Sequence, residues 1–282
     1  MDAHIIPVVL LAAFFHAAWN ASVKLGDDKI LALAALQIAG AAIALVLAPL
    51  VGLPEAASWP YLLASVALHF GYNLCLASAY RHGDFAQAYP LARGAAPLLV
   101  TLWGVFVLRE ALSDAGLAAV GVVIAGILIF ATRRIGAVWR QRNALASALA
   151  TACFIAAYTV VDGVGARLSH NIVGYIAWLA LLDGALFASY ALHRRSLREV
   201  VALKQRWRVG ALGAALSLAA YAMVLWAMSQ APIAVVSALR ETSIIIAALI
   251  GAYYFKEPAG ARRIVASAVI FAGIVLLGWA ET

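Results

Sequence analysis

Ten long apolar segments make up most of this chain, and they constrain its fold more than any other feature. A helix needs ~20 apolar residues to cross a hydrocarbon core of ~30 Å. The segments are Ile5–Val23, Ile30–Val51, Trp59–Tyr80, Phe85–Leu108, Ala115–Thr132, Ala144–Val164, Ile172–Leu192, Val209–Met228, Ile233–Phe255 and Ile264–Ala280. The connections between them are too short to hold a soluble domain. The sequence therefore predicts an all-α membrane protein with ten transmembrane helices.

The composition and motif content exclude several classes of function. Hydrophobic residues make up 66% of the 282-residue chain and charged residues 12%, which excludes a soluble enzyme and a disordered chain. An outer-membrane barrel would alternate polar and apolar residues along each strand. The sequence contains no HExxH, GxSxG or Walker motif and no Cys/His metal spacing. We therefore expect no enzymatic activity, no bound metal and no cofactor.

The net charge of +7 comes mostly from basic residues that lie between the apolar segments. The connections after the odd-numbered segments hold 16 Lys and Arg residues, whereas the other side holds only Arg109 and Arg167. Such a bias places the basic connections in the cytoplasm and both termini on the non-cytoplasmic side. The charge thus reflects membrane orientation, and we expect no nucleic-acid partner.

An internal repeat divides the chain into two halves. Residues 85–131 resemble residues 232–278, and an offset of 147 residues aligns Arg93 with Arg240 and Glu110 with Glu257. We assign residues 1–132 to a first five-helix repeat, residues 133–143 to a basic cytoplasmic linker and residues 144–282 to a second repeat. Because five is odd, the second repeat must start on the opposite side of the membrane. Inverted repeats of this kind are typical of transporters that bind substrate at the repeat interface near the midplane.

The two five-helix halves and the paired acids Glu110 and Glu257 resemble the drug/metabolite transporter superfamily, EamA type. The opening sequence His16-Ala17-Ala18-Trp19-Asn20 is similar to first-helix motifs of that group. The resemblance implies a bacterial-type inner-membrane protein that transports small metabolites by alternating access. Family members include exporters of amino acids, among them aromatic ones. Relatives are often drawn with cytosolic termini, so the charge bias of this chain departs from that drawing.

Other roles stay open at this stage. The same fold could serve a flippase of lipid-linked sugars or phospholipids, and a membrane-embedded enzyme is the least favoured alternative. The partners we expect are a small-molecule substrate and membrane lipid, with the protein a monomer or homodimer.

Polar and aromatic side chains recur at helical spacing in several apolar segments. Residues four apart share a helix face, so these stripes predict an aromatic-lined cavity in which rings stack on the substrate. The predicted substrate-binding residues are His16, Trp19, Asn20, His69, Tyr72, Asn73, Tyr89, Arg93, Tyr158, Asp162, Tyr175, Trp178, Tyr221 and Arg240. A structural alternative for the aromatic residues is plain packing or an interfacial belt. Asp162 lies close to the predicted end of its helix, where it could also be solvated.

Ionisable groups within a membrane are costly and are often functional. Arg93 and Arg240 enter from opposite faces and could fork onto a carboxylate or phosphate. Glu241 follows Arg240 directly, but adjacent side chains point about 100° apart on a helix, which makes it a poor partner. Asp183 and Glu241 are candidates for proton coupling, although an interhelical hydrogen bond is the favoured role for each.

The remaining features have mainly structural roles. Glu110 and Glu257 precede the fifth and tenth segments, where an acid caps the positive end of a helix, and we expect them to be structural caps. Pro90 and Pro97 can kink the fourth segment and make it a moving gate or a static bend. The fifth and tenth segments carry small residues and almost no polar groups, which is typical of close packing. We expect these two helices to form a scaffold or a dimer contact.

Overall fold

A computed structural model describes residues 4–24, 29–82, 85–131, 142–194, 207–253 and 260–281 of the chain. Its helices are α1 (Ile5–Lys24), α2 (Lys29–Val51), the short 3₁₀ helix η1 (Ala56–Ser58), α3 (Trp59–His82), α4 (Phe85–Phe106), α5 (Asp114–Ala131), α7 (Arg142–Ser169), α8 (Ile172–Arg194), α10 (Trp207–Gln230), α11 (Ile233–Arg240), α12 (Ser243–Tyr253) and α13 (Ala261–Glu281). A helix satisfies its backbone hydrogen bonds within itself, which an apolar segment in lipid requires. These helices confirm the predicted all-α fold of ten spanning segments.

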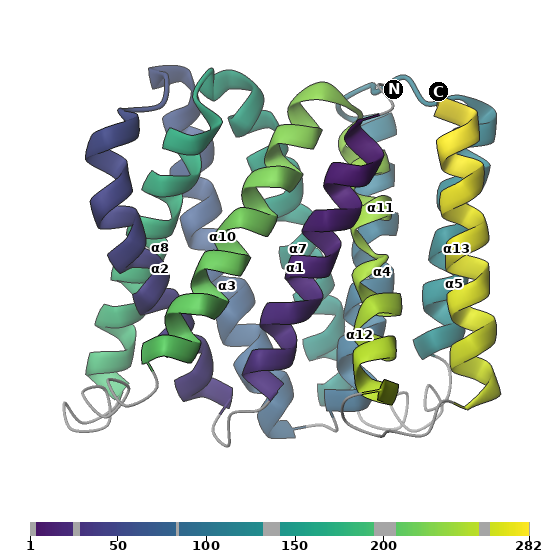
Figure 1. Ribbon diagram of the computed structural model, residues 1–282, viewed down its shortest axis with the longest axis horizontal. Helices are drawn as coiled ribbons and strands as arrows, with labels where there is room; N and C mark the ends of the chain where they lie inside the picture. Colours follow the sequence, from purple (N-terminus) through teal and green to yellow (C-terminus); the bar gives the residue numbers. More distant parts are fainter. Residues whose placement is uncertain are drawn as a thin grey trace.

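The apolar character of the helices fits a bilayer environment. Within the described residues, five helices are long and apolar enough by themselves to cross a membrane. The beginning of α1 and the end of α13 lie at the same end of the bundle (Figure 1). Ten crossings, an even number, bring the two chain ends together in this way.

The ninth segment differs from the continuous helix that the sequence predicts. It is divided into α11 and α12 by a turn at Glu241 and Thr242. In this turn the amide of Glu241 donates to the carbonyl of Ala238 and the amide of Thr242 to that of Leu239, both at 3.1 Å. These are the tighter three-residue bonds of a 3₁₀ helix, which often mark a functional break inside a helix.

The two halves pack on each other with the symmetry of an inverted repeat. The contact of α1 with α10 is matched by that of α7 with α3, in which each helix is exchanged for its counterpart in the other half. The contact of α4 with α7 is matched in the same way by the contacts of α1 with α11 and α12. The principal helix contacts therefore join one half to the other, and the interface between the halves lies inside the bundle.

Helices α5 and α13 show this symmetry at atomic detail. They pack against each other at one edge of the bundle (Figure 1). A Cβ atom on Gly126 would lie 2.8 Å from the amide nitrogen of Ile270 and 3.2 Å from the carbonyl oxygen of Ala266. A Cβ atom on Gly273 would lie at the same two distances from Val123 and Ala119. Because all three residue pairs obey the offset of 147, the repeat seen in the sequence is also a structural one.

Glu110 caps a helix, but not the helix that follows it in the sequence. Helix α5 is capped by Ser113, whose hydroxyl accepts a hydrogen bond of 2.9 Å from the amide of Gly116. The carboxylate of Glu110 instead accepts hydrogen bonds from the amides of Ile233 and Ala234, at 2.9 and 3.4 Å. These amides form the first turn of α11, so an acid of the first half stabilises a helix of the second half. Its repeat counterpart Glu257 lies outside the described residues.

Arg167 completes the contact around Glu110. One of its guanidinium nitrogens, Nη2, lies 2.9 Å from Oε1 of Glu110 and 3.0 Å from the carbonyl oxygen of Ala231, and Nε donates to the carbonyl of Met228 at 2.9 Å. Arg167 thus caps the end of α10 while Glu110 caps the start of α11. Together they connect α7 and the α10–α11 turn to the connection before α5.

Candidate functional site

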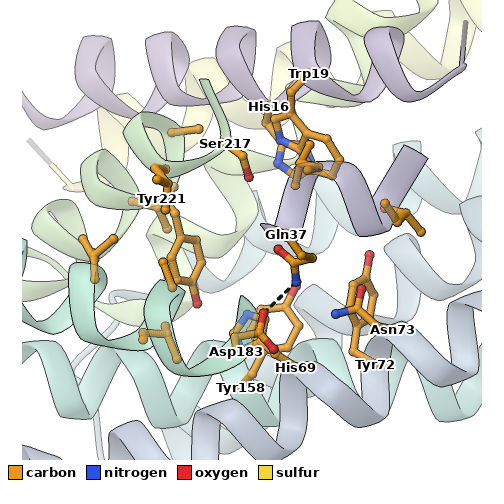
Figure 2. A pocket seen from close by; sticks show the side chains of 18 of the residues that line it. His16, Trp19, Gln37, His69, Tyr72, Asn73, Tyr158, Asp183, Ser217 and Tyr221 are labelled. Carbon is orange, nitrogen blue, oxygen red and sulfur yellow. Dashed lines mark hydrogen bonds between the residues drawn. The ribbon is translucent and has the colours of Figure 1, made fainter. Parts of the chain in front are cut away.

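A cavity of about 160 Å³ lies between the two halves of the bundle. Helices α1, α2 and α3 of the first half and α7, α8, α10 and α11 of the second half all contribute to its wall. The polar and aromatic residues of this wall are Arg240 and the residues labelled in Figure 2, namely His16, Trp19, Gln37, His69, Tyr72, Asn73, Tyr158, Asp183, Ser217 and Tyr221. Its volume is below the ~300–1,000 Å³ of pockets for drug-sized ligands. The cavity therefore suits a small molecule.

The acidic group of the wall is Asp183 on α8. Its side chain is 6% exposed, and its Oδ2 atom accepts a hydrogen bond of 2.6 Å from the amide of Gln37 on α2 (Figure 2). The other carboxylate oxygen, Oδ1, is buried without a hydrogen-bond partner. A buried carboxylate oxygen without a donor is costly, so this atom can accept a hydrogen bond from a ligand.

The basic group of the wall is Arg240, the last residue of α11. It is 5% exposed, and its Nε and Nη2 atoms have no hydrogen-bond partner. The break after α11 brings Oε1 of Glu241 to 3.8 Å from Nε, so the two neighbours form an ion pair that the continuous helix of the sequence prediction disfavoured. This distance is too long for a hydrogen bond. The guanidinium thus keeps donors for an anionic group in the cavity.

Aromatic rings form the part of the wall around α3 and α7. The rings of His69 and Tyr158 stack with centroids 4.1 Å apart. Tyr72 meets Tyr158 edge-on at 5.7 Å, and on α1 the rings of His16 and Trp19 meet edge-on at 5.2 Å. Rings arranged in this way offer both faces and edges to an apolar or aromatic ligand.

Asp162 lies behind the wall rather than in it. The structure corrects the expectation that Asp162 could be solvated, because α7 continues to Ser169 and the side chain is 0% exposed. Its Oδ1 atom accepts a hydrogen bond of 2.9 Å from the hydroxyl of Tyr175, and its Oδ2 atom accepts one from the hydroxyl of Tyr221. Tyr175 is also fully buried outside the cavity, whereas Tyr221 faces the cavity. Tyr221 therefore connects the buried carboxyl group to the site.

Some of the other predicted site residues lie outside the cavity wall, and the rest have side chains that the structure does not describe. Asn20 and Trp178 lie outside the cavity wall, where Asn20 donates to the carbonyl of His16 at 2.8 Å and the Trp178 indole donates to the carbonyl of Gly52 at 3.3 Å. Glu241 is buried next to Arg240 but does not line the cavity. Pro97 is inside α4 and buried. The structure describes the backbone of Tyr89, Pro90 and Arg93 within α4 but not their side chains, so the predictions for these residues stay predictions.

Gln37 and Ser217 line the cavity although the sequence prediction did not include them. Gln37 had a detectable signal, because it is the one polar residue in the apolar segment Ile30–Val51. A lone amide in a spanning helix needs a hydrogen-bond partner inside the protein. Among the described residues, no group of three or more His, Cys, Asp or Glu side chains could hold a metal ion.

Inverted halves with a polar cavity between them define a membrane transporter of small molecules. Both halves match the model of the EamA-like transporter family, at residues 4–132 and 142–279. A solved structure described as "Crystal structure of protein" has the same fold, with a TM-score of 0.76, full coverage of both chains and 18% identity. No curated protein matches the chain. The chain belongs to the EamA-like transporter family, whose members are membrane transporters rather than enzymes.

Proposed function

We propose that this transporter exports amino acids, including aromatic ones, by alternating access through the cavity between its halves. The observation that carries this proposal is that one cavity presents both a buried acid and a buried base with unsatisfied polar atoms. Asp183 offers its Oδ1 atom as an acceptor, and Arg240 offers Nε and Nη2 as donors. A zwitterionic amino acid carries the complementary pair of charges.

The two buried charges explain why a zwitterion would be favoured over a singly charged molecule. In an apolar environment, an ion without a partner costs several kcal/mol. The ammonium group of a substrate would satisfy Asp183, and its carboxylate would fork onto Arg240. A ligand with only one of these groups would leave the polar atoms of the other protein group without a hydrogen bond.

The rings of Tyr72, Tyr158 and Trp19 would hold the side chain of the substrate. They lie on three helices around the cavity, so a planar ring can contact a face of one and an edge of another. Aromatic pairs of this kind contribute ~0.5–1.5 kcal/mol beyond the burial of their area. This wall supports aromatic amino acids as substrates.

The symmetry of the packing supports alternating access. Because the cavity lies where helices of both halves meet, a rocking of one half against the other would expose it to either face of the membrane in turn. We place the protein in a bacterial-type inner membrane, as a monomer or homodimer, with both termini on the non-cytoplasmic side. The export direction follows from the resemblance to amino acid exporters of the family.

Efflux from liposomes tests this function with three matched compounds. Phenylalanine carries both charged groups, phenethylamine lacks the carboxylate, and phenylpropionate lacks the ammonium group. We expect phenylalanine to compete best for transport, and each analogue to bind about ten- to hundredfold more weakly, since each loses one charge-assisted interaction of ~1.5–3 kcal/mol.

Two results would contradict this function. Equal affinity for the three compounds would mean that Asp183 and Arg240 do not bind the substrate. No transport of any amino acid in a wider panel, together with scrambling of a labelled lipid, would favour the flippase alternative.

A further inference from the structure

We propose that Asp162 is a proton-binding site that couples transport to the proton gradient, and that Tyr221 links it to the cavity. This inference rests on the membership of the transporter family. The proposed contact of the substrate with Asp183 enters only where we infer that proton and substrate move in opposite directions. Nothing in the sequence pattern indicated this role, because Asp162 was expected near a helix end.

The surroundings of Asp162 differ from those of the buried acids Glu110 and Glu241. Glu241 has a cation at 3.8 Å and Glu110 has one at 2.9 Å. Among the residues that the structure describes, no Lys or Arg forms an ion pair with Asp162, which is held by neutral hydroxyl groups instead. A carboxylate inside a membrane without a counter-charge is costly, and carboxyl groups in such positions commonly bind and release protons.

A hydrogen bond connects Asp162 to the cavity. It comes from the hydroxyl of Tyr221, which faces the cavity and donates to Oδ2 of Asp162. Ser65 and His69 lie close to the same carboxyl group, and the Ser65 hydroxyl is 3.0 Å from Nδ1 of His69 in the cavity wall. A proton can therefore reach the buried carboxylate through the hydroxyl of Tyr221.

Binding of the proton would change the hydrogen bonds at the cavity wall. The step converts the carboxylate of Asp162 and one proton from water into a neutral carboxylic acid, and the reverse step returns that proton to water on the other face. The new O–H group at Oδ2 would donate to Tyr221, whose own hydrogen would turn toward the cavity. The wall at Tyr221 would thereby change from an acceptor to a donor of hydrogen bonds.

The charges around Asp162 set the sign of the coupling. The groups facing it are His69 from α3, Tyr175 and Asp183 from α8, and Tyr221 from α10, with Arg240 from α11 acting on Tyr221. The part of α4 whose side chains the structure describes, residues 95–106, contributes no titratable group. A proton on Asp162 removes a negative charge that would attract an ammonium group at Asp183, so the binding of one disfavours the binding of the other. Proton and substrate should therefore exchange, which drives export when the outside is acidic.

A ligand-free measurement tests the proton site directly. Infrared spectra of the purified protein should show a protonated carboxyl band that appears on acidification. The band should be absent in Asp162→Asn and retained in the matched variant Asp183→Asn. A band that titrates unchanged in Asp162→Asn would overturn the assignment, whatever the substrate is.

Flux measurements test the coupling. We expect an acidic outer medium to accelerate the efflux of labelled phenylalanine from wild-type liposomes. In Asp162→Asn this acceleration should disappear while exchange of labelled for unlabelled phenylalanine persists, whereas Asp183→Asn should bind more weakly but keep its response to the gradient. Acceleration that persists in Asp162→Asn, or that is lost only in Asp183→Asn, would overturn the proposal.

A second variant covers the case in which Asp162→Asn does not fold. Tyr221→Phe keeps the carboxyl group and removes the hydroxyl that joins it to the cavity. We expect the infrared band to remain and the response of efflux to the gradient to fall. A response equal to that of the wild type would exclude Tyr221 as the link.

Discussion

The buried charged residues of this transporter differ in the partners that they contact. Glu110 has a cation and two helix amides, and Asp162 has two tyrosine hydroxyls. Arg240 and Asp183 each keep polar atoms without a hydrogen bond, and both face the cavity. Because unsatisfied buried charges destabilise the protein, their presence in one wall suggests that a ligand completes them.

The planar fork of Arg240 should matter as well as its charge. We expect Arg240→Lys to lower the affinity for phenylalanine about ten- to hundredfold, since an ammonium group cannot form the bidentate contact. The affinity for phenethylamine, which has no carboxylate, should change little. Transport competition normalised to folded protein measures both values, and equal losses would leave Arg240 with a structural role only.

Whole elements are stabilised by contacts that cross between the two halves. The first turn of α11 receives its cap from Glu110 in the first half. The two ends of α11 are therefore held differently. Its first turn is fixed by the buried carboxylate of Glu110, whereas its last turn stops at the break beside Arg240. This arrangement holds Arg240 at the cavity, and α12 begins as a separate helix after the break.

Removal of the cap tests this dependence. Glu110→Ala leaves two amides of α11 without their acceptor and removes the ion-pair partner of Arg167. We expect a loss of about 1.5–3 kcal/mol in the free energy of unfolding, measured by denaturation in detergent. The exposed Glu55, mutated to Ala, serves as the control and should change stability by less than about 0.5 kcal/mol. A similarly small effect at Glu110 would show that its contacts contribute little.

The close contact of α5 and α13 depends on the absence of a side chain at Gly126. An alanine there would place its Cβ atom 2.8 Å from a backbone nitrogen of Ile270, so the helices must separate. We expect Gly126→Ala to destabilise the protein by ~1–3 kcal/mol. Gly121 on the same helix has nothing within 4 Å, and Gly121→Ala should instead stabilise by up to ~1 kcal/mol. The thermal unfolding temperatures of the two variants measure this difference. Equal shifts of that temperature would contradict a close contact at Gly126.

At the scale of the molecule, the inverted halves place connections of very different charge at the two ends of the bundle. Helices α1, α3, α5, α8 and α12, which precede the connections with 16 basic residues, end opposite to the chain termini (Figure 1). Basic connections stay in the cytoplasm during insertion. The fold itself would allow either orientation, so we expect the charge to decide between them.

Reporter fusions measure this orientation. A phosphatase that is active only outside the cytoplasm should be active when fused after Thr282, and a fluorescent protein that requires the cytoplasm should be dark there. The same reporters placed after Arg134, in a basic connection, should give the opposite result. A cytoplasmic signal at Thr282 would restore the orientation usually drawn for the family.

The sequence by itself determined the spanning segments and the division into halves. Both depend on local properties, because bilayer thickness sets the length of an apolar segment and an odd number of helices inverts the second half. It also indicated most of the polar and aromatic residues that line the cavity, because spacing along one helix determines which side chains share a face. Their role in binding stays a prediction.

Only the tertiary structure decided which partners the buried groups have. The hydrogen bond of Asp162 with Tyr221 and the capping of α11 by Glu110 both join residues far apart in the sequence. The same holds for Gln37, whose partner Asp183 lies 146 positions further along the chain. Helical periodicity predicts which side chains share a face of one helix, but the group opposite that face depends on how the helices pack.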